Sequence, residues 1–285
     1  MRSILTLLLL VGLRAGAQGP VTPPPMPVEQ ERRVATMPSN VQMYEQFRYW
    51  AGFQPQDIRA DALRHYEEYL ASRGVSAAER AKHIKTIESE GRLLEVERWN
   101  RILTSEAPTF NTNPNAFLVE MTRDRPPGTA LDVGMGQGRN AIYLAQQRWA
   151  VTGFDPADKA VAQAQATAAQ LGLKLTTYVQ GDDDFDFGTE RWDLIVMTYV
   201  AVRPLVERVV RGLKPGGIVV VEGFHRDVTR NSSVGGAVVF DTNELPQLFS
   251  KLRVLRYEDV IAKTDFGGDA SRAVRLCAQK EIVGQ

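Results

Sequence analysis

Short apolar runs alternate with helical patterns over the C-terminal part of the chain. The runs predict strands over residues 130–133, 151–155, 175–180, 192–197 and 218–222. Apolar strands that alternate with helices are typical of a parallel sheet covered on both faces. Two later runs, 253–262 and 273–280, are joined by a glycine-containing turn and predict a hairpin at the end of the sheet.

Apolar residues recur at helical spacing in the segment 41–104. We expect helices over residues 41–50 and 57–72, and a longer helix that begins at Ser76. Ser76 and Glu79 have the spacing of a capping box, in which each side chain bonds to the other residue's backbone N–H. One apolar face per helix predicts that this segment packs against the main domain.

The first 40 residues have the composition of a leader followed by a linker. A positive charge, an apolar stretch over residues 4–13 and small residues at 15–17 predict a signal peptide over residues 1–17. The stretch is too short for an ordinary membrane span. Dense prolines predict an extended linker over residues 18–40. We therefore expect an exported, periplasmic bacterial protein without a stable span after cleavage, or a cytoplasmic protein if translation starts further along.

Residues 131–140 form a strand, a turn with three alternate glycines, and the start of a helix. Glycine allows a sharp turn and a close approach of backbone to ligand, and a helix start presents unpaired N–H groups. Asp155 ends the next strand, 21 positions after Gly134, and Asp182 and Asp183 follow the third. Ligands of open parallel sheets bind at the carboxyl ends of strands. The pattern predicts a nucleotide-type site.

These motifs, in this order, resemble the class I S-adenosylmethionine-dependent methyltransferases. The resemblance extends from about Trp99 to the C-terminus, and it includes Trp192-Asp193 and the Leu-Lys-Pro-Gly-Gly sequence at 213–217. Trp99-Asn100 and residues 113–115 are most similar to the small-molecule branch of tellurite-resistance and thiopurine-type enzymes. The resemblance implies a Rossmann-like α/β fold over residues 105–285, with a seven-stranded, mostly parallel sheet, helices on both faces and an antiparallel final strand.

The resemblance also implies a role for each residue of the cofactor site. S-adenosyl-L-methionine would lie with its methionine portion against Gly134, Met135 and Gly136, and its ammonium against Asp132. Asp155 would accept hydrogen bonds from the ribose. Asp182 would accept one from the adenine amine, with Asp183 as the next candidate. No metal site is expected.

A dinucleotide-binding dehydrogenase is the main alternative for a glycine-rich turn of this kind. Its fingerprint requires a third glycine three positions after the second, where helix and strand pack closely. Arg139 occupies that position. The acids at 182–184 also fit a cationic ligand better than a pyrophosphate, so the sequence disfavours this alternative.

Methyl transfer requires alignment above all, because the sulfonium is already activated. Tyr199 and His225 follow the fourth and fifth strands, and they are the candidates for a catalytic base. Arginines 203, 226 and 230 are candidates for holding an anionic acceptor. Residues 197–202 lack the Asn-Pro-Pro-Tyr motif, which disfavours methylation of DNA bases.

The composition limits the kinds of binding partner and substrate that we expect for this protein. Lys plus Arg and Asp plus Glu both number 34, so no net charge favours nucleic acid. The single cysteine, Cys277, excludes an internal disulfide and is expected to pack in the final strand. We expect methyl transfer to a small molecule. The alternative is a non-catalytic S-adenosylmethionine-binding or interaction protein of the periplasm. The sequence determines neither the acceptor nor the oligomeric state.

Overall fold

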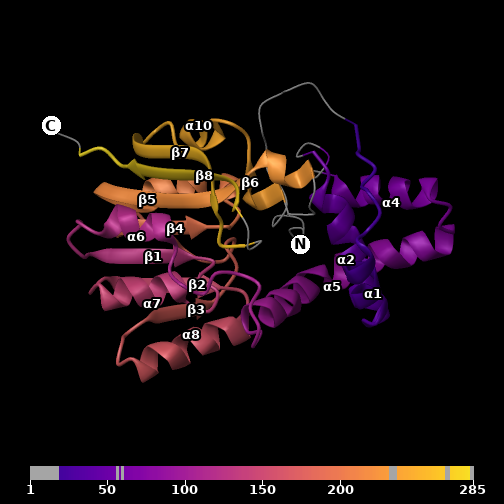
Figure 1. Ribbon diagram of the computed structural model, residues 1–285, viewed down its shortest axis with the longest axis horizontal. Coiled ribbons are helices and arrows are strands. Elements are labelled where there is room, and N and C mark those ends of the chain that lie inside the picture. The colour runs from indigo at the N-terminus through magenta and orange to yellow at the C-terminus, as the bar shows by residue number, and fades with distance from the viewer. Residues whose placement is uncertain (1–18, 56–57, 59–60, 231–235, 267–269, 283–285) are drawn as a thin grey trace. The chain divides into compact units, whose positions relative to one another are not determined.

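The chain forms two compact units in the computed structural model (Figure 1). The structure describes residues 19–55, 58, 61–230, 236–266 and 270–282. One unit comprises Met1–Glu95 with Arg226–Val239, and the other comprises Val96–His225 with Phe240–Gln285. The predicted signal peptide, residues 57, 59 and 60 of the predicted helix 57–72, residues 231–235 and residues 267–269 of the predicted hairpin turn lie outside the described residues.

Helices around an aromatic core make up the N-terminal unit. They are α1 (Val28–Ala35), α2 (Ser39–Gly52), α4 (Ala62–Ser72) and the first part of α5 (Ala77–Leu103). The rings of Phe47 and Trp50 contact the ring of Tyr66, with centroids 5.2 and 5.3 Å away. Ser76 accepts the N–H of Glu79, as one half of the expected capping box. The predicted helices are therefore confirmed, although α4 begins later than expected.

The extended linker predicted for residues 18–40 is wrong in its second half, where α1 lies. Pro27 and Pro38 directly precede α1 and α2, and no proline interrupts residues 28–37. Proline fixes φ near a helical value and loses no needed donor at a helix start, so these prolines delimit helices. The first half of the predicted linker is packed as well. The N–H of Val21 donates to Oε1 of Gln54, and the carbonyl of Val21 accepts from Nε2 of Gln54.

A twisted sheet is the centre of the second unit (Figure 1). Its strands are β1 (Thr129–Val133), β2 (Ala150–Asp155), β3 (Thr176–Val179), β4 (Trp192–Thr198), β5 (Leu213–His225), β7 (Arg253–Lys263) and β8 (Ala270–Gln279). They lie in the order β3-β2-β1-β4-β5-β8-β7, and β8 is antiparallel to both of its neighbours. The predicted seven strands and the antiparallel final strand are confirmed. A two-residue strand, β6 (Val239–Phe240), also pairs with β5.

Helices cover both faces of this sheet. They are α6 (Ala116–Thr122), α7 (Arg139–Gln146), α8 (Asp158–Gln170), α9 (Val206–Gly212) and α10 (Glu244–Leu248). Alternate strand residues point to opposite faces: Leu131 packs in the cluster that includes α9 and α10, whereas Ala130 packs in the cluster of α6 and α7. Among the described residues, no helix is long and apolar enough to cross a membrane.

The register of the sheet determines where the predicted site residues meet. Val133, the last residue of β1, pairs with Phe154 of β2 and Met197 of β4. The segments that leave these three strands therefore begin side by side. The glycine turn, Asp155 and Tyr199 come together at this carboxyl edge of the sheet, as expected for an open parallel sheet.

Candidate functional site

Three glycines shape the turn between β1 and α7. Gly134, Gly136 and Gly138 have φ values of +63°, +54° and +82°, a region that side chains rarely adopt. A Cβ on Gly134 would lie 2.5 Å from Val200, and one on Gly138 would lie 2.8 Å from Ala164. The glycines therefore serve both the backbone conformation and the close packing of the turn.

Met135 contributes to this turn through its backbone. Its N–H donates to the carbonyl of Phe154 at 3.1 Å, and its side chain packs against Gly153, Val161 and Ala164. The side chain is 5% exposed. Any contact with a cofactor would therefore come from its main chain.

Asp132 carries an unusual carboxylate at the end of β1. It is 1% exposed, and its Oδ2 has no hydrogen-bond partner among the residues that the structure describes. Burial raises the pKa of Asp132 to about 7. The positive charge of Arg139 and a hydrogen bond from the N–H of Ala141 act in the opposite direction and limit this rise. A buried acceptor without a donor is costly unless a ligand supplies one. An ammonium group is a ligand of that kind.

Asp155 holds the backbone of the turn in place. Its Oδ2 accepts the N–H of Gly136 at 2.9 Å, and its Oδ1 accepts the N–H of Ala157 at 2.8 Å. Burial raises the pKa of Asp155, and these two hydrogen bonds oppose that rise. Each carboxylate oxygen keeps a second lone pair, so the predicted ribose contact remains open to Asp155.

Asp155→Ala is expected to weaken S-adenosylmethionine binding at least about tenfold and to lower the melting temperature. A hydrogen bond to a charged group contributes roughly 1.5–3 kcal/mol, and about 1.4 kcal/mol corresponds to one decade in Kd. The variant also leaves the N–H groups of Gly136 and Ala157 without their acceptor. Calorimetric titration and thermal melts measure both effects. An unchanged isotherm would show that another residue holds the ribose.

The two acids after β3 differ in their surroundings. Asp182 is half-buried, and burial followed by the charge of Asp183 raises its pKa. Its carbonyl accepts a hydrogen bond from the guanidinium of Arg208 on α9. Asp183 is exposed. Of the two acids, Asp182 is the better placed for the predicted adenine contact, which stays a prediction.

Tyr199 follows β4 with a φ of +58°, which is rare for a residue with a side chain. Its hydroxyl donates to Oε1 of Glu222 at 2.6 Å and accepts the N–H of Asp265 at 3.1 Å. Burial and the negative charge of Glu222 raise the pKa of Tyr199 far above its usual range. A phenol held in this way fits a structural role better than that of a base.

Tyr199→Phe is expected to destabilise the fold by roughly 1–3 kcal/mol, because it removes the donor to Oε1 of the buried Glu222 and the acceptor of the buried N–H of Asp265. Glu222 keeps its ion pair with Arg275. S-adenosylmethionine affinity should change little, since the hydroxyl's two bonds go to protein groups. Chemical denaturation and calorimetry separate the two effects. A folded variant of normal stability that binds the cofactor but transfers no methyl group would restore the catalytic role.

The other acceptor-site candidates have partners in the structure. His225 is 6% exposed, and its Nε2 lies 3.0 Å from the hydroxyl of Thr242. Arg203 makes an ion pair with Glu244 in which both carboxylate oxygens accept, and it lies over the ring of Phe240. Arg203 is thus a poor anchor for an anionic acceptor. Arg226 and Arg230 belong to the other unit, in a 3-10 helix (Arg226–Arg230).

The end of α5 covers the glycine turn, which the sequence indicated only through Trp99-Asn100. Leu103 lies where a Cβ on Gly136 would contact it, at 3.3 Å. Asn100 donates to Asp158 at 2.6 Å and accepts the N–H of Lys159 at 3.0 Å, which ties α5 to the start of α8. Trp99 packs edge-on against Phe266. Leu103 is thus the side chain of this helix end that lies against the turn.

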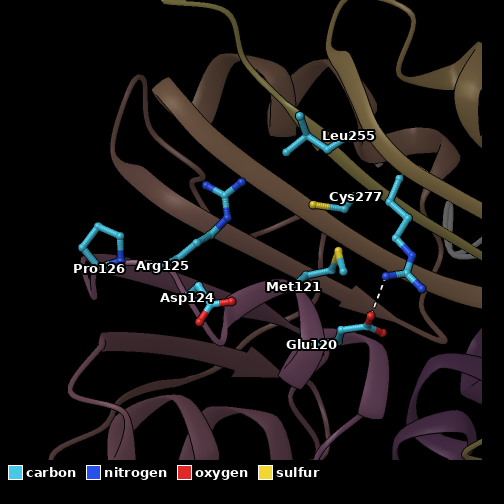
Figure 2. A pocket seen from close by; sticks show the side chains of 8 residues that line it. Glu120, Met121, Asp124, Arg125, Pro126, Leu255 and Cys277 are labelled. Carbon is cyan, nitrogen blue, oxygen red and sulfur yellow. Dashed lines mark hydrogen bonds and ion pairs between the residues drawn. The ribbon is translucent and has the colours of Figure 1, made fainter.

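A separate cavity of about 520 Å³ lies between α6 and the strands β7 and β8 (Figure 2). Its lining includes Met121, Arg125, Leu255 and Cys277 and none of the predicted site residues. Cys277 is a buried free thiol, and burial raises its pKa to about 11. The thiol is therefore protonated at neutral pH, in agreement with its expected packing role. Among the described residues, no group of His, Cys, Asp and Glu is arranged to hold a metal ion.

Comparison with known proteins shows which class of enzyme the chain resembles. Residues 130–217 match the model of a methyltransferase domain. The chain is 31% identical over 140 residues to an uncharacterized methyltransferase of Synechocystis sp., which covers 45% of this chain and 64% of that protein. It is 25% identical over 219 residues to the probable S-adenosyl-L-methionine-dependent methyltransferase TehB of Haemophilus influenzae, which covers 66% of this chain and 76% of the relative.

A solved structure agrees in fold. The crystal structure of TehB from Haemophilus influenzae superposes with a TM-score of 0.50 at 23% identity, over 59% of this chain and 62% of that one. The second unit thus has the fold of an S-adenosylmethionine-dependent methyltransferase. The chain is similar to the class I family of these enzymes, and among them to the tellurite-resistance branch. Its match spans just under two thirds of the Synechocystis relative's length.

The residues present fit the cofactor of this family, S-adenosyl-L-methionine. The unpartnered Oδ2 of Asp132 supplies an acceptor for an ammonium group. The positive-φ glycines form a turn whose main chain carries no side chains at these three positions.

Proposed function

We propose that this protein transfers the methyl group of S-adenosylmethionine to a small-molecule acceptor. The observation that carries the proposal is the buried carboxylate of Asp132, which has one oxygen without a donor at the start of the glycine turn. The match of residues 130–217 to a methyltransferase domain supports the same chemistry. The balanced charge of the chain favours a small acceptor over nucleic acid.

The bound cofactor would supply an activated methyl group, so the protein's part is to bind, orient and exclude water. Asp132 and Asp155 would fix the two ends of the glycine turn against the cofactor. Tyr199, Phe224 and Phe266 form a group of aromatic rings at the ends of β4 and β5, with centroids 5.0 and 5.2 Å from that of Tyr199. Apolar walls of this kind exclude water and let alignment contribute roughly 7–11 kcal/mol in favourable cases.

The acceptor we propose is a nucleophile that needs no base from the protein, such as a thiolate or a neutral amine. The hydroxyl of Tyr199 donates a hydrogen bond to Glu222, and its raised pKa keeps it protonated. His225 lies beside Thr242. Since both candidate bases have partners in the part of the chain that the structure describes, alignment would carry the reaction.

Calorimetric titration of the purified chain with S-adenosylmethionine and with S-adenosylhomocysteine tests the first half of this proposal. A screen of thiol, amine and oxyanion acceptors for release of S-adenosylhomocysteine tests the second half. Binding of both ligands and turnover with at least one acceptor is the expected result. Binding without turnover would favour the non-catalytic alternative, and absence of binding would contradict the proposal.

We also propose that the chain is exported and cleaved after Ala17, on the strength of its charge, apolar stretch and small residues at 15–17. S-adenosylmethionine is made in the cytoplasm, so export would require a supply of cofactor outside. Fractionation of the host and N-terminal sequencing measure the outcome. A chain that begins at Gln18 outside the cytoplasm is expected, whereas a cytosolic chain that begins at Met1, Met26 or Met37 would overturn the proposal.

A further inference from the structure

A buried ion pair lies at the end of the glycine turn and belongs to none of the sequence motifs. Nη2 of Arg139 is 2.7 Å from Oδ2 of Asp265, and the side chains are 10% and 7% exposed. Arg139 is the first residue of α7 and directly follows Gly138. Asp265 lies between β7 and β8, 126 residues further along the chain.

Asp265 is the centre of a larger group of polar contacts. Its Oδ1 accepts from Nδ2 of Asn111 at 2.9 Å, and its Oδ2 also accepts from Nδ2 of Asn115 at 2.8 Å. Its backbone N–H donates to the hydroxyl of Tyr199. A buried carboxylate is retained in ionised form only when several donors and an opposite charge surround it. Asn111, Asn115 and Arg139, from two separate segments, meet this requirement at the carboxylate of Asp265.

The ion pair is close to the predicted position of the cofactor's charged end. Arg139 is separated from Asp132 only by the glycine turn, and its positive charge acts on the carboxyl group of Asp132. Nη1 of Arg139 donates to the carbonyl of Asn113 at 3.0 Å, so the guanidinium is directed toward Asp265 and Asn113. Without Asp265, an unpaired cation would remain beside the site.

We propose that Asp265 is a positioning residue that neutralises Arg139 and turns it away from the cofactor site, and thereby lets the site accept a cationic ligand. The inference rests on the proposed binding of S-adenosylmethionine. That ligand has an ammonium and a sulfonium, whereas S-adenosylhomocysteine has the ammonium alone. An unpaired cation beside the site disfavours the extra positive charge of the sulfonium.

The ratio of the affinity for S-adenosylmethionine to the affinity for S-adenosylhomocysteine therefore reports on the ion pair of Arg139 and Asp265. Asp265→Asn keeps an oxygen acceptor but removes the negative charge, and we expect it to weaken S-adenosylmethionine binding roughly three- to tenfold more than S-adenosylhomocysteine binding. Arg139→Gln removes the cation and leaves Asp265 charged, so it should shift the ratio in the opposite direction. The double variant should return the ratio close to that of the unmodified protein.

Asp259→Asn is the matched control, because it disrupts an ion pair with Arg272 on the same hairpin, at 2.6 and 2.7 Å, outside the site. It should leave the ratio unchanged. Calorimetry with both ligands gives the affinities, and thermal melts identify variants that do not fold.

Different results separate this inference from the proposed function. If the unmodified protein binds neither ligand, the proposed function fails. If the unmodified protein binds both, and Asp265→Asn and Arg139→Gln change the two affinities equally, then Asp265 has only a structural role and the inference is overturned. Either single variant decides the question if the other does not fold, because the two shifts have opposite signs.

Discussion

Asp132→Asn is expected to abolish measurable S-adenosylmethionine binding, with a loss of at least about a hundredfold in affinity. The side chain is buried, and its Oδ2 has no partner in the described part of the chain. A cofactor ammonium would make a charge-assisted hydrogen bond there. Asparagine removes the negative charge, and its amide NH2 is a hydrogen-bond donor that cannot accept a bond from the cofactor's ammonium. A hydrogen bond to a charged group contributes roughly 1.5–3 kcal/mol, and an unpaired buried ammonium adds further cost.

The same residue should make cofactor affinity depend on pH. Burial raises the pKa of Asp132 to about 7, and an ammonium pairs with the ionised form. Affinity is therefore expected to rise with pH up to about 7 and to change little above it. Calorimetry between pH 6 and 8 should show this rise in the unmodified protein. A flat profile would indicate that Asp132 is already ionised, or that it does not meet the ammonium.

The stability of the ligand-free protein should show the opposite trend. The folded pKa lies above the ordinary value of 3.8, so folding takes up a proton between these two pH values. The contribution of Asp132 to the free energy of unfolding therefore falls as pH rises from about 4 to 7, by roughly 1.4 kcal/mol per pH unit. Asp132→Asn lacks this decline, so its stability relative to the unmodified protein should increase over that range in chemical denaturation.

Asp186→Asn is a suitable control for both experiments. Asp186 is an exposed acid, and its carboxylate accepts the N–H of Gly188, away from the glycine turn. The control should keep the binding, the pH dependence of binding and the pH dependence of stability. A loss of binding in this control as large as that in Asp132→Asn would point to a general effect of charge.

Gly136→Val is the second change expected to eliminate cofactor binding. Gly136 has a φ of +54°, and a Cβ there would lie 3.3 Å from the side chain of Leu103. Valine is branched at Cβ and disfavours this backbone region strongly. Its side chain would also press on Leu103 and displace the backbone of the turn, where the cofactor contacts are predicted. We expect at least about a hundredfold loss of affinity, since two or more hydrogen bonds of roughly 1.5 kcal/mol each would be lost.

Gly172→Val separates backbone strain from loss of the site. Gly172 has a φ of +67°, close to that of Gly136, but it is exposed and a Cβ there would meet nothing within 4 Å. Both variants should lose stability from the strained φ. Only Gly136→Val should lose S-adenosylmethionine in calorimetry. Normal binding by a folded Gly136→Val protein would remove the glycine turn from the site.

The order of elements was readable from local patterns. Apolar runs and helical spacing depend on neighbours within a few residues, so β1, β2, β4 and their helices lie where the sequence predicts them. Glycine at 134, 136 and 138 was also a local signal, because each position needs a positive φ. The prolines at 27 and 38 are interpreted from the sequence as part of an extended linker, but each directly precedes a helix. Proline is common in both settings, so its presence alone does not distinguish them.

Roles that depend on buried partners were not readable in this way. Asp155 was expected at the ribose, and the structure adds that both of its oxygens hold backbone N–H groups of the turn. Tyr199 is a candidate base from its position after β4, and in the structure its hydroxyl makes hydrogen bonds with Glu222 and with the N–H of Asp265. In each case the acid or the phenol has a partner that is distant in the sequence or is a main-chain atom with no sequence signature.

The sequence by itself determined the fold class, the glycine turn and the acids that end β1 and β2, because hydrophobic period and backbone conformation act over a few neighbouring residues. Only the tertiary structure decided that Arg139 pairs with Asp265 across 126 positions, and that Oδ2 of Asp132 has no donor. The physical reason is that a buried charge must be satisfied by whatever the fold brings to it. Burial and pairing are properties of the assembled chain, and no local pattern encodes them.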